Sequence, residues 1–359
     1  MVEEMAQAGT PGSKNWRSAV RSRAAELVGA ATESIVLTSS TSAGINLVAS
    51  GLSWKPSDNI VLKETEHPTV LYPWVYQARQ AGFEVRRVRS KGQHVSENAL
   101  IKAIDHHTRV VAVSHVEFGT GYRNDLPRLA AAAHSARAFF LVDAIQSLGT
   151  TPMDVNECAI DCLASGGFKW MCGPRGTGFA YLHPKLMDSL TPPFEDSFNL
   201  SSDEEQRAKL LLRAGLTSEI GSAPFAAGWR RLEPRGTSPV LLRGLAMSLS
   251  QLLEVGIDRI AQRIDDLIAL LLDECRRASI PVLSSQEMQH RSAIVTVGVP
   301  FDLTDLEEIQ ALERRLIEEQ LVAHPRAGGL RFGVHAFNNE QDVDRAVRVV
   351  AAMWQGHRV

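Results

Sequence analysis

An aspartate and a lysine stand in this sequence where they could do chemistry together. Asp143 ends the apolar run 139–142, and Lys169 lies between the glycine pair 166–167 and the dipeptide 173–174, Gly-Pro. An apolar run that ends in a carboxylate is typical of a buried parallel strand, which delivers a charged group to the carboxyl edge of its sheet. The flanking glycines and proline place Lys169 on a turn. We interpret the two residues as the groups that hold pyridoxal 5′-phosphate (PLP).

PLP needs an amine for its aldehyde and an anion for its ring nitrogen, and Lys169 and Asp143 supply them. The many glycines near Lys169 (166, 167, 173, 176 and 178) suit a close approach of backbone to a ligand. Alternatives remain open from the residues alone. Lys169 could be a solvated turn residue, and Asp143 could be a helix N-cap with Gln146 as its capping-box partner.

PLP also needs a phosphate site and a flat group beside its ring. The run 38–44 (Thr-Ser-Ser-Thr-Ser-Ala-Gly) precedes a predicted helix, and hydroxyls at a helix N-terminus bind phosphate. His67 follows a predicted strand and could stack on the ring. Simple helix capping and a structural histidine are the plainer alternatives. No GxxxxGK[ST] sequence occurs, and 173–178 is not GxGxxG, so a nucleotide site is not predicted.

The elements that must position these residues alternate between strand and helix. The pattern predicts a mostly parallel, doubly wound α/β sheet, whose ligands lie beyond the carboxyl ends of its strands. The predicted strands are 35–38, 59–62, 83–85, 109–115, 138–143 and 177–182, and the predicted helices are 13–29, 39–51, 69–80, 96–104 and 125–136.

The alternation of strand and helix ends after residue 182. Residues 195–213 are predicted to form an exposed excursion, and a smaller α+β domain follows. That domain has predicted helices at 238–254, 257–279, 303–319 and 340–354 and strands at 293–297 and 330–332. We therefore divide the chain into a shortened N-terminal helical segment (1–30), a PLP-binding large domain (31–235) and a small C-terminal domain (236–359).

The composition is that of a globular protein, with 359 residues, 44% of them hydrophobic, and a net charge of −3. The basic residues are scattered, so we expect no nucleic-acid partner. No apolar run approaches the roughly 20 residues of a membrane span, and the first residues do not form a secretory signal. The four cysteines fit no zinc spacing, so we expect free thiols, no bound metal and a cytoplasmic location.

Three segments resemble one family of enzymes. The sequences 142–149 (VDAIQSLG), 166–170 (GGFKW) and 173–178 (GPRGTG) are similar to the class V aminotransferase family of fold type I PLP enzymes. That family includes cysteine desulfurases, selenocysteine lyases and isopenicillin N epimerase-like proteins. The likeness extends from about Trp16 to the C-terminus, and the Asp143-to-Lys169 segment is its most specific part.

The resemblance assigns a role to each candidate residue. It implies that Lys169 bonds the cofactor and acts as the base, that Asp143 pairs with the pyridinium, and that Gln146 bonds the ring hydroxyl. It further implies that His67 stacks on the ring. The remaining implied roles are phosphate binding by Thr41 and Ser42, phosphate binding across a homodimer interface by Thr237, and substrate-carboxylate binding by Arg331.

The sequence departs from the family at four places. Phe168 replaces a frequent histidine before the lysine, and Gly166 occupies a position where desulfurases often carry serine. The loop 324–329 (HPRAGG) lacks the cysteine that receives sulfur in desulfurases. The segment before the first helix is short compared with that of relatives, which would affect closure over the substrate.

The expected function is a PLP-dependent aminotransferase or lyase that acts on a small α-amino acid. Lys169 would remove the Cα proton from an external aldimine, giving either transamination or β-elimination of the C–S lyase type. A persulfide-forming desulfurase is the less favoured variant because loop 324–329 lacks cysteine. The alternatives are a catalytically impaired PLP-binding dimer partner, and an α/β protein unrelated to PLP.

Overall fold

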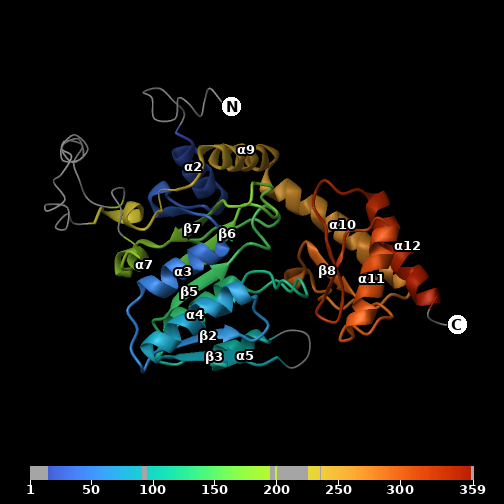
Figure 1. The fold of residues 1–359 in the computed structure, drawn as a ribbon, viewed down its shortest axis with the longest axis horizontal. Coiled ribbons are helices and arrows are strands. Elements are labelled where there is room, and N and C mark those ends of the chain that lie inside the picture. Colours follow the sequence, from blue (N-terminus) through green and yellow to red (C-terminus); the bar gives the residue numbers. More distant parts are fainter. Residues whose placement is uncertain (1–14, 91–94, 195–198, 200–224, 235, 357–359) are drawn as a thin grey trace.

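One seven-stranded sheet with helices on both faces forms the larger part of the molecule (Figure 1). The computed structural model describes residues 15–90, 95–194, 199, 225–234 and 236–356, so nearly all of the predicted excursion at 195–213 lies outside the described residues. The strand order is β1-β7-β6-β5-β4-β2-β3. The strands are β1 Ile35–Thr38, β2 Asn59–Lys63, β3 Glu84–Val88, β4 Thr108–Ser114, β5 Phe139–Asp143, β6 Cys162–Gly166 and β7 Gly178–Leu182.

The sheet is parallel except at β7, which runs antiparallel to both β6 and β1. The predicted mostly parallel, doubly wound sheet is therefore confirmed. Alternate residues of each strand enter different cores, as the two-residue period of a strand requires. In β4, Val111 and Val113 join one hydrophobic cluster while Val110 and Ala112 join the other, so both faces of the sheet are covered.

The helices of this larger part begin at residues that cap them. Ser40 accepts a hydrogen bond from the N–H of Ala43 at the start of α3, and Asp125 caps α6 in the same way. At the other end, Gly29 closes α2 with a left-handed φ of 66°. The bounds are α2 Trp16–Val28, α3 Thr41–Gly51, α4 Pro68–Ala81, α5 Glu97–Lys102, α6 Leu126–Ser135 and α7 Pro184–Ser189, with short 3₁₀ turns at Thr32–Ser34 and Gly228–Arg231.

The smaller part packs helices against a three-stranded antiparallel sheet of order β8-β10-β9 (Figure 1). Its elements are α10 Ile257–Arg277, a 3₁₀ turn at Met288–His290, β8 Ile294–Val297, α11 Leu306–Glu318, β9 His324–Arg326, β10 Gly329–Gly333 and α12 Glu340–Gly356. The expected smaller α+β unit is confirmed. Helix α9 (Pro239–Val255) packs on α2, whereas α10 packs on α12. The exact division at residue 236 stays a prediction.

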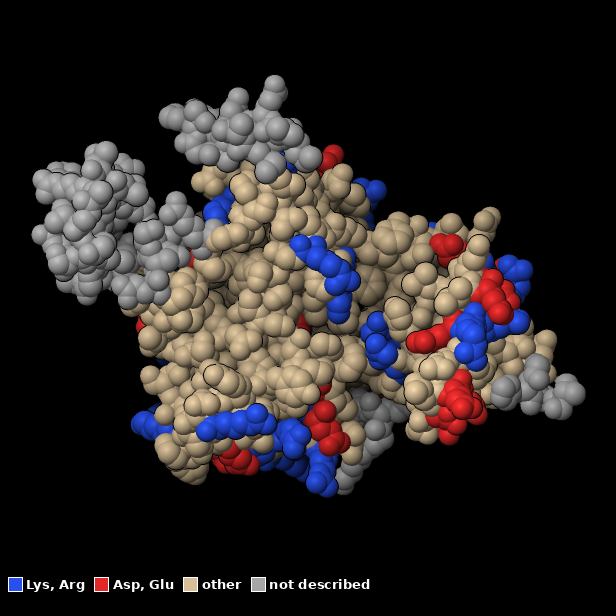
Figure 2. Space-filling view, in the orientation of Figure 1, with Lys and Arg blue, Asp and Glu red and all other residues tan. Residues whose placement is uncertain are grey.

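A sharp bend separates α9 from α10. No single described helix is long and apolar enough to cross a membrane; α9 and α10 together have that length and composition, but their axes differ by 76°. Both helices contribute a row of apolar side chains to the buried core, although Met247 and Val255 of α9 are exposed. On the face shown in Figure 2, lysines and arginines occur in small groups with acidic side chains among them.

Candidate active site

Asp143 stands at the carboxyl edge of the large sheet as the last residue of β5. It lies in register with Ser114 of β4, and the backbone N–H of His115 donates to its carbonyl oxygen at 2.9 Å. The carboxylate is buried, and its Oδ1 accepts from the N–H of Ile145 at 2.9 Å. Burial raises the pKa of Asp143 to about 6, although that hydrogen bond and the charge of Lys169 oppose the rise.

The chain after Asp143 forms turns at 145–150, so the helix N-cap alternative is wrong. Gln146 is buried and does not act as a capping-box partner. Its Oε1 instead accepts a hydrogen bond from Nε1 of Trp170 at 3.1 Å. Gly149 (φ 98°) packs against the backbone of Trp170, because a Cβ at this position would lie 2.6 Å from the Trp170 carbonyl oxygen. Gln146 is thus held beside the turn that carries Lys169.

Lys169 lies on the turn that follows β6, as predicted, and its side chain is half-buried. Burial lowers the pKa of the amine, Arg331 and Arg175 lower it further, and the carboxylate of Asp143 opposes the change. Asp143 and Lys169 therefore lie within electrostatic reach of each other. The structure brings together the two residues on which the sequence interpretation depends, and it adds Arg331 to the same neighbourhood.

Contacts within the protein explain two of the glycines around Lys169, where the sequence analysis expected the approach of a ligand. A Cβ on Gly178 would lie 2.4 Å from the Ser165 carbonyl oxygen, and a Cβ on Gly167 would lie 2.7 Å from Leu245. Gly178 is therefore required by a backbone contact within the protein, and Gly167 is favoured by its packing against a side chain. The expectation that glycine marks the approach of a ligand here is therefore not needed to explain these two positions.

The hydroxyls of Thr41 and Ser42 stand in the first turn of α3, at the same edge of the sheet as Asp143. Thr41 is buried, and its Oγ1 accepts a hydrogen bond from the backbone N–H of Gly166 at 2.9 Å. The Oγ of Ser42 lies 3.3 Å from Oγ1 of Thr69 at the start of α4. The first turn of a helix offers backbone N–H groups to an anion, and these hydroxyls lie within that turn.

His67 and Arg331 approach the site from opposite parts of the molecule. His67 caps α4, and its ring meets Phe118 edge-on, with the ring centroids 5.0 Å apart. Arg331, on β10 of the smaller part, donates from Nη1 to the Phe118 carbonyl oxygen at 2.6 Å. Burial lowers the pKa of His67, and the charges of Lys169, Arg326 and Arg331 lower it further. The His67 ring is therefore held mainly in its neutral form.

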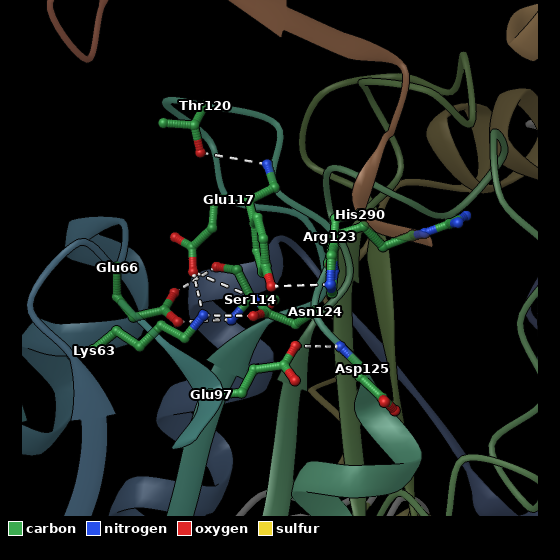
Figure 3. Close-up of polar contacts among 11 residues, drawn as sticks. Lys63, Glu66, Glu97, Ser114, Glu117, Thr120, Arg123, Asn124, Asp125 and His290 are labelled. Carbon is green, nitrogen blue, oxygen red and sulfur yellow. Dashed lines mark hydrogen bonds and ion pairs between the residues drawn. The ribbon is translucent and has the colours of Figure 1, made fainter. Parts of the chain in front are cut away.

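A buried charged network supports this edge of the sheet (Figure 3). Lys63, the fully buried last residue of β2, pairs with Oε1 of Glu117 at 3.0 Å and bonds Asn124. Glu66 accepts from the backbone N–H of Ser114 at 2.9 Å and bonds the Ser114 hydroxyl. Burial and the charge of Glu117 raise the pKa of Glu66 to about 8, although Lys63 opposes the rise. One carboxylate is therefore held protonated at neutral pH.

The sequence reasoning missed this network, and it also missed His115 beside Asp143. Lys63 closes an apolar strand in the same way as Asp143 does, so that pattern was a usable signal. His115 is buried, and its Nδ1 has no hydrogen-bond partner among the described residues. Burial lowers the pKa of His115 to about 3, so its ring is neutral. His115 contacts Asp143 through its backbone N–H, and Ser114 is the residue in register with Asp143, so this contact does not place the His115 ring in the candidate site.

Thr237 lies apart from the other predicted residues. It is half-buried and directly precedes Ser238, the N-cap of α9. Within one chain, the described residues include no recorded hydrogen bond between Thr237 and the groups around Lys169. The predicted contact of Thr237 with a partner subunit stays a prediction.

The described groups fit PLP. An amine of lowered pKa faces a buried carboxylate, hydroxyls lie at a helix N-terminus, and a guanidinium stands nearby. In the described part of the chain, no group of three or more His, Cys, Asp or Glu side chains could hold a metal ion.

Comparison with protein families gives one match over nearly the whole chain. The family described as "Aminotransferase class-V" matches residues 13–345. The chain is 29% identical over 277 residues to an uncharacterised protein of Schizosaccharomyces pombe, covering 76% of this chain and 61% of that protein. It is 35% identical over 173 residues to a probable cysteine desulfurase of Methanothermobacter thermautotrophicus, covering 48% and 43%. Both matches span less than two thirds of the relative's own length.

Solved structures share the fold. The apo cysteine desulfurase of Thermococcus onnurineus superposes with a TM-score of 0.83 at 22% identity, covering 99% of this chain and 91% of that chain. The cystine C–S lyase C-DES, in complex with cysteine persulfide, gives a TM-score of 0.82 at 20% identity, with coverage of 98% and 93%. At this identity the likeness concerns the architecture, namely the large sheet with its smaller companion domain.

Proposed function

This chain belongs to the class-V aminotransferase family, and from that membership we propose that it is a PLP-dependent enzyme acting on a small α-amino acid. When bound, PLP supplies an aldehyde that condenses with amines and a ring that withdraws electrons from the substrate Cα. The observation that carries the proposal is the common electrostatic neighbourhood of Asp143, Lys169 and Arg331 at the carboxyl edge of the sheet.

Lys169 is the proposed proton carrier. Because burial and two neighbouring arginines lower the pKa of its amine, more of the amine is unprotonated at neutral pH than in a free lysine. An unprotonated amine can accept the proton from the substrate Cα and later return it. Asp143 limits the shift, so the amine keeps enough basicity to take that proton.

Asp143, Gln146, Thr41 and Ser42 are proposed to hold the cofactor. The Asp143 carboxylate would pair with the protonated ring nitrogen, whose positive charge would lower the carboxylate pKa and keep it ionised. The Oε1 of Gln146 is occupied by Trp170, so its amide NH₂ remains as a donor for the ring hydroxyl. The hydroxyls of Thr41 and Ser42 would bond the phosphate at the start of α3.

Arg331 and His67 are proposed to orient the substrate and the ring. Only Nη1 of Arg331 is recorded as donating to Phe118, so the other guanidinium N–H groups can take a carboxylate in a bidentate fork. Burial and the neighbouring cations favour the neutral His67 ring, which suits stacking on the cofactor.

We propose that the reaction releases a sulfur substituent from the substrate Cβ, as a C–S lyase does. Relatives named cysteine desulfurase and a structural neighbour named cystine C–S lyase support sulfur chemistry. Loop 324–329 has no cysteine, which favours direct release of sulfur over its storage as a persulfide on that loop. The catalytically impaired, PLP-binding dimer partner remains the alternative function.

A homodimer is also part of the proposal. Tyr72 and Tyr76 lie one turn apart on α4, directly after His67, and are 65% and 59% exposed; Met247 of α9 is 51% exposed. Aromatic residues and methionine are enriched where protein surfaces meet. Thr237, at the start of α9, would then contribute its hydroxyl to the phosphate site of the partner subunit.

A product assay tests the proposal. Protein loaded with PLP is incubated with cysteine, cystine and a panel of other amino acids, and sulfide and 2-oxo acids are measured. We expect sulfide with a 2-oxo acid from a sulfur amino acid, and no turnover by Lys169→Ala. The exposed-site variant Lys102→Ala should match the wild type.

Arg331→Lys should lower kcat/KM by about 10- to 100-fold, since it removes charge-assisted hydrogen bonds of about 1.5–3 kcal/mol. Transamination without sulfide would contradict the lyase assignment. A yellow protein without turnover on any amino acid would support the non-catalytic alternative.

A further inference from the structure

A hollow opens at the amino edge of the large sheet, away from Asp143. It has a volume of about 570 Å³ and is lined by the beginnings of β4 and β5, the end of α6, the turn before β6, and residues 181–185. Phe139 in its wall and Asp143 at the candidate active site are the first and last residues of β5. At a rise of about 3.3 Å per residue, roughly 13 Å of strand separates them. We call this hollow the amino-edge pocket.

The amino-edge pocket is lined by more positive than negative charge. Arg109, Arg137 and Lys185 line it with one carboxylate, that of Asp161. Oδ2 of Asp161 already accepts from the backbone N–H of Phe140 at 2.8 Å and lies 2.8 Å from Nε2 of His134. Among the described residues, the three cations have no ion-pair partner. An anion that entered the pocket would meet charges that the protein leaves uncompensated.

Arg109 is the pocket cation with the clearest unpaired polar group. Its side chain is half-buried at the start of β4, and its Nε is buried without a hydrogen-bond partner among the described residues. The guanidinium lies 5.6 Å from the centre of the Phe139 ring, so one flank of the pocket pairs a cation with an aromatic face. A buried N–H without a partner is costly, and this Nε is out of reach of solvent. An anion in the pocket would therefore meet the terminal nitrogens of the Arg109 guanidinium.

The backbone conformation of Arg137 also supports an anion site in this pocket. It follows the end of α6 with a left-handed φ of 62°, a place where α2 and α4 carry Gly29 and Gly82. Ser279 and Gln320 take the same conformation, so the strain alone is no argument. Arg137, however, also places its guanidinium in the lining of the amino-edge pocket, together with Arg109 and Lys185. Glycine would suit the backbone better but would bring no charge.

We propose that the amino-edge pocket binds a small phosphorylated metabolite that carries at least two negative charges. The volume lies within the roughly 300–1,000 Å³ typical of small-molecule sites. Planar guanidinium groups match phosphate oxygens, and Phe139 and Tyr181 supply apolar walls. This site is separate from the proposed PLP site and does not depend on it.

Calorimetric titration of the PLP-loaded protein with inorganic pyrophosphate at fixed ionic strength tests the proposal. Loading with PLP fills the other phosphate position. We expect saturable binding at one site per chain, weakened at least tenfold in the double variant Arg109→Gln/Lys185→Gln. The control Arg276→Gln/Arg348→Gln removes two exposed charges elsewhere and should keep the wild-type affinity.

A further variant distinguishes a loss of binding from a loss of folding. Arg137→Gly removes a pocket cation and relieves the left-handed backbone, so it should unfold at or above the wild-type temperature and still bind pyrophosphate more weakly. Absence of saturable binding to the wild type would overturn the proposal. So would full affinity in both pocket variants, full affinity in Arg137→Gly alone, or an equal loss in the control.

Discussion

At the carboxyl edge of the large sheet Lys63 is completely buried and pairs with Glu117, whereas at the amino edge Lys185 is exposed and forms no ion pair with any residue that the structure describes. The same strands connect the two edges. Burial is costly for a charge unless a partner compensates it, so the carboxyl edge is a closed network of lysine, glutamate, serine and asparagine. The amino edge stays open to water, which solvates its cations. The comparison teaches that one sheet can hold a buried network of paired charges at one edge and exposed, unpaired cations at the other.

The largest expected effect is a difference in the free energy of unfolding between lysine-to-methionine substitutions at the two edges. Lys63→Met would leave the Glu117 carboxylate buried without its cation, so we expect a loss of about 3–5 kcal/mol in the free energy of unfolding. Lys185→Met changes an exposed residue and should stay within about 0.5 kcal/mol of the wild type. Urea unfolding measures both, and equal effects at the two edges would break the comparison.

A smaller effect concerns the pH dependence of stability. The pKa of Glu66 is raised to about 8 in the native state and that of Asp143 to about 6, above their values in an unfolded chain. These two carboxyl groups therefore bind more protons in the native state between about pH 4 and pH 8, so their contribution to stability falls as pH rises through this window. Histidines with a lowered pKa, such as His115, contribute in the opposite direction below about pH 7. The Glu66 contribution is therefore isolated by comparing variants, as the slope of the urea midpoint between pH 6 and pH 8 without added cofactor.

Glu66→Gln should flatten that slope because glutamine imitates the protonated carboxyl group and can still bond Ser114. The exposed-site control Glu318→Gln should leave the slope intact. If Glu66→Gln kept the full slope between pH 6 and pH 8, burial of Glu66 would not be its cause.

The sequence predicted the parts of the site that lie close to element ends. Asp143 ends an apolar run and Lys169 lies between glycines, so both could be located from local patterns. Strand β6 was not predicted, although it directly precedes Lys169, because its sequence Cys-Leu-Ala-Ser-Gly is short and weakly apolar. The antiparallel direction of β7 was also not predictable, since strand direction depends on how the chain returns across the sheet.

Contacts between distant residues escaped the sequence analysis. Lys63 and Glu117 are 54 residues apart, and Arg331 reaches Phe118 across 213 residues. No periodicity or motif links such pairs, and only the folded chain brings them together. The amino-edge pocket was missed for the same reason, because Arg109, Arg137 and Lys185 come from three separate elements.

The central claim, that Lys169 holds PLP opposite Asp143, is tested most directly by reductive trapping. The protein is mixed with PLP, its visible spectrum is recorded, borohydride is added, and the digested peptides are mapped by mass spectrometry. We expect a yellow band that reduction removes, with the cofactor mass fixed on the peptide containing Lys169. Absence of the band, or attachment to a different lysine, would contradict the claim.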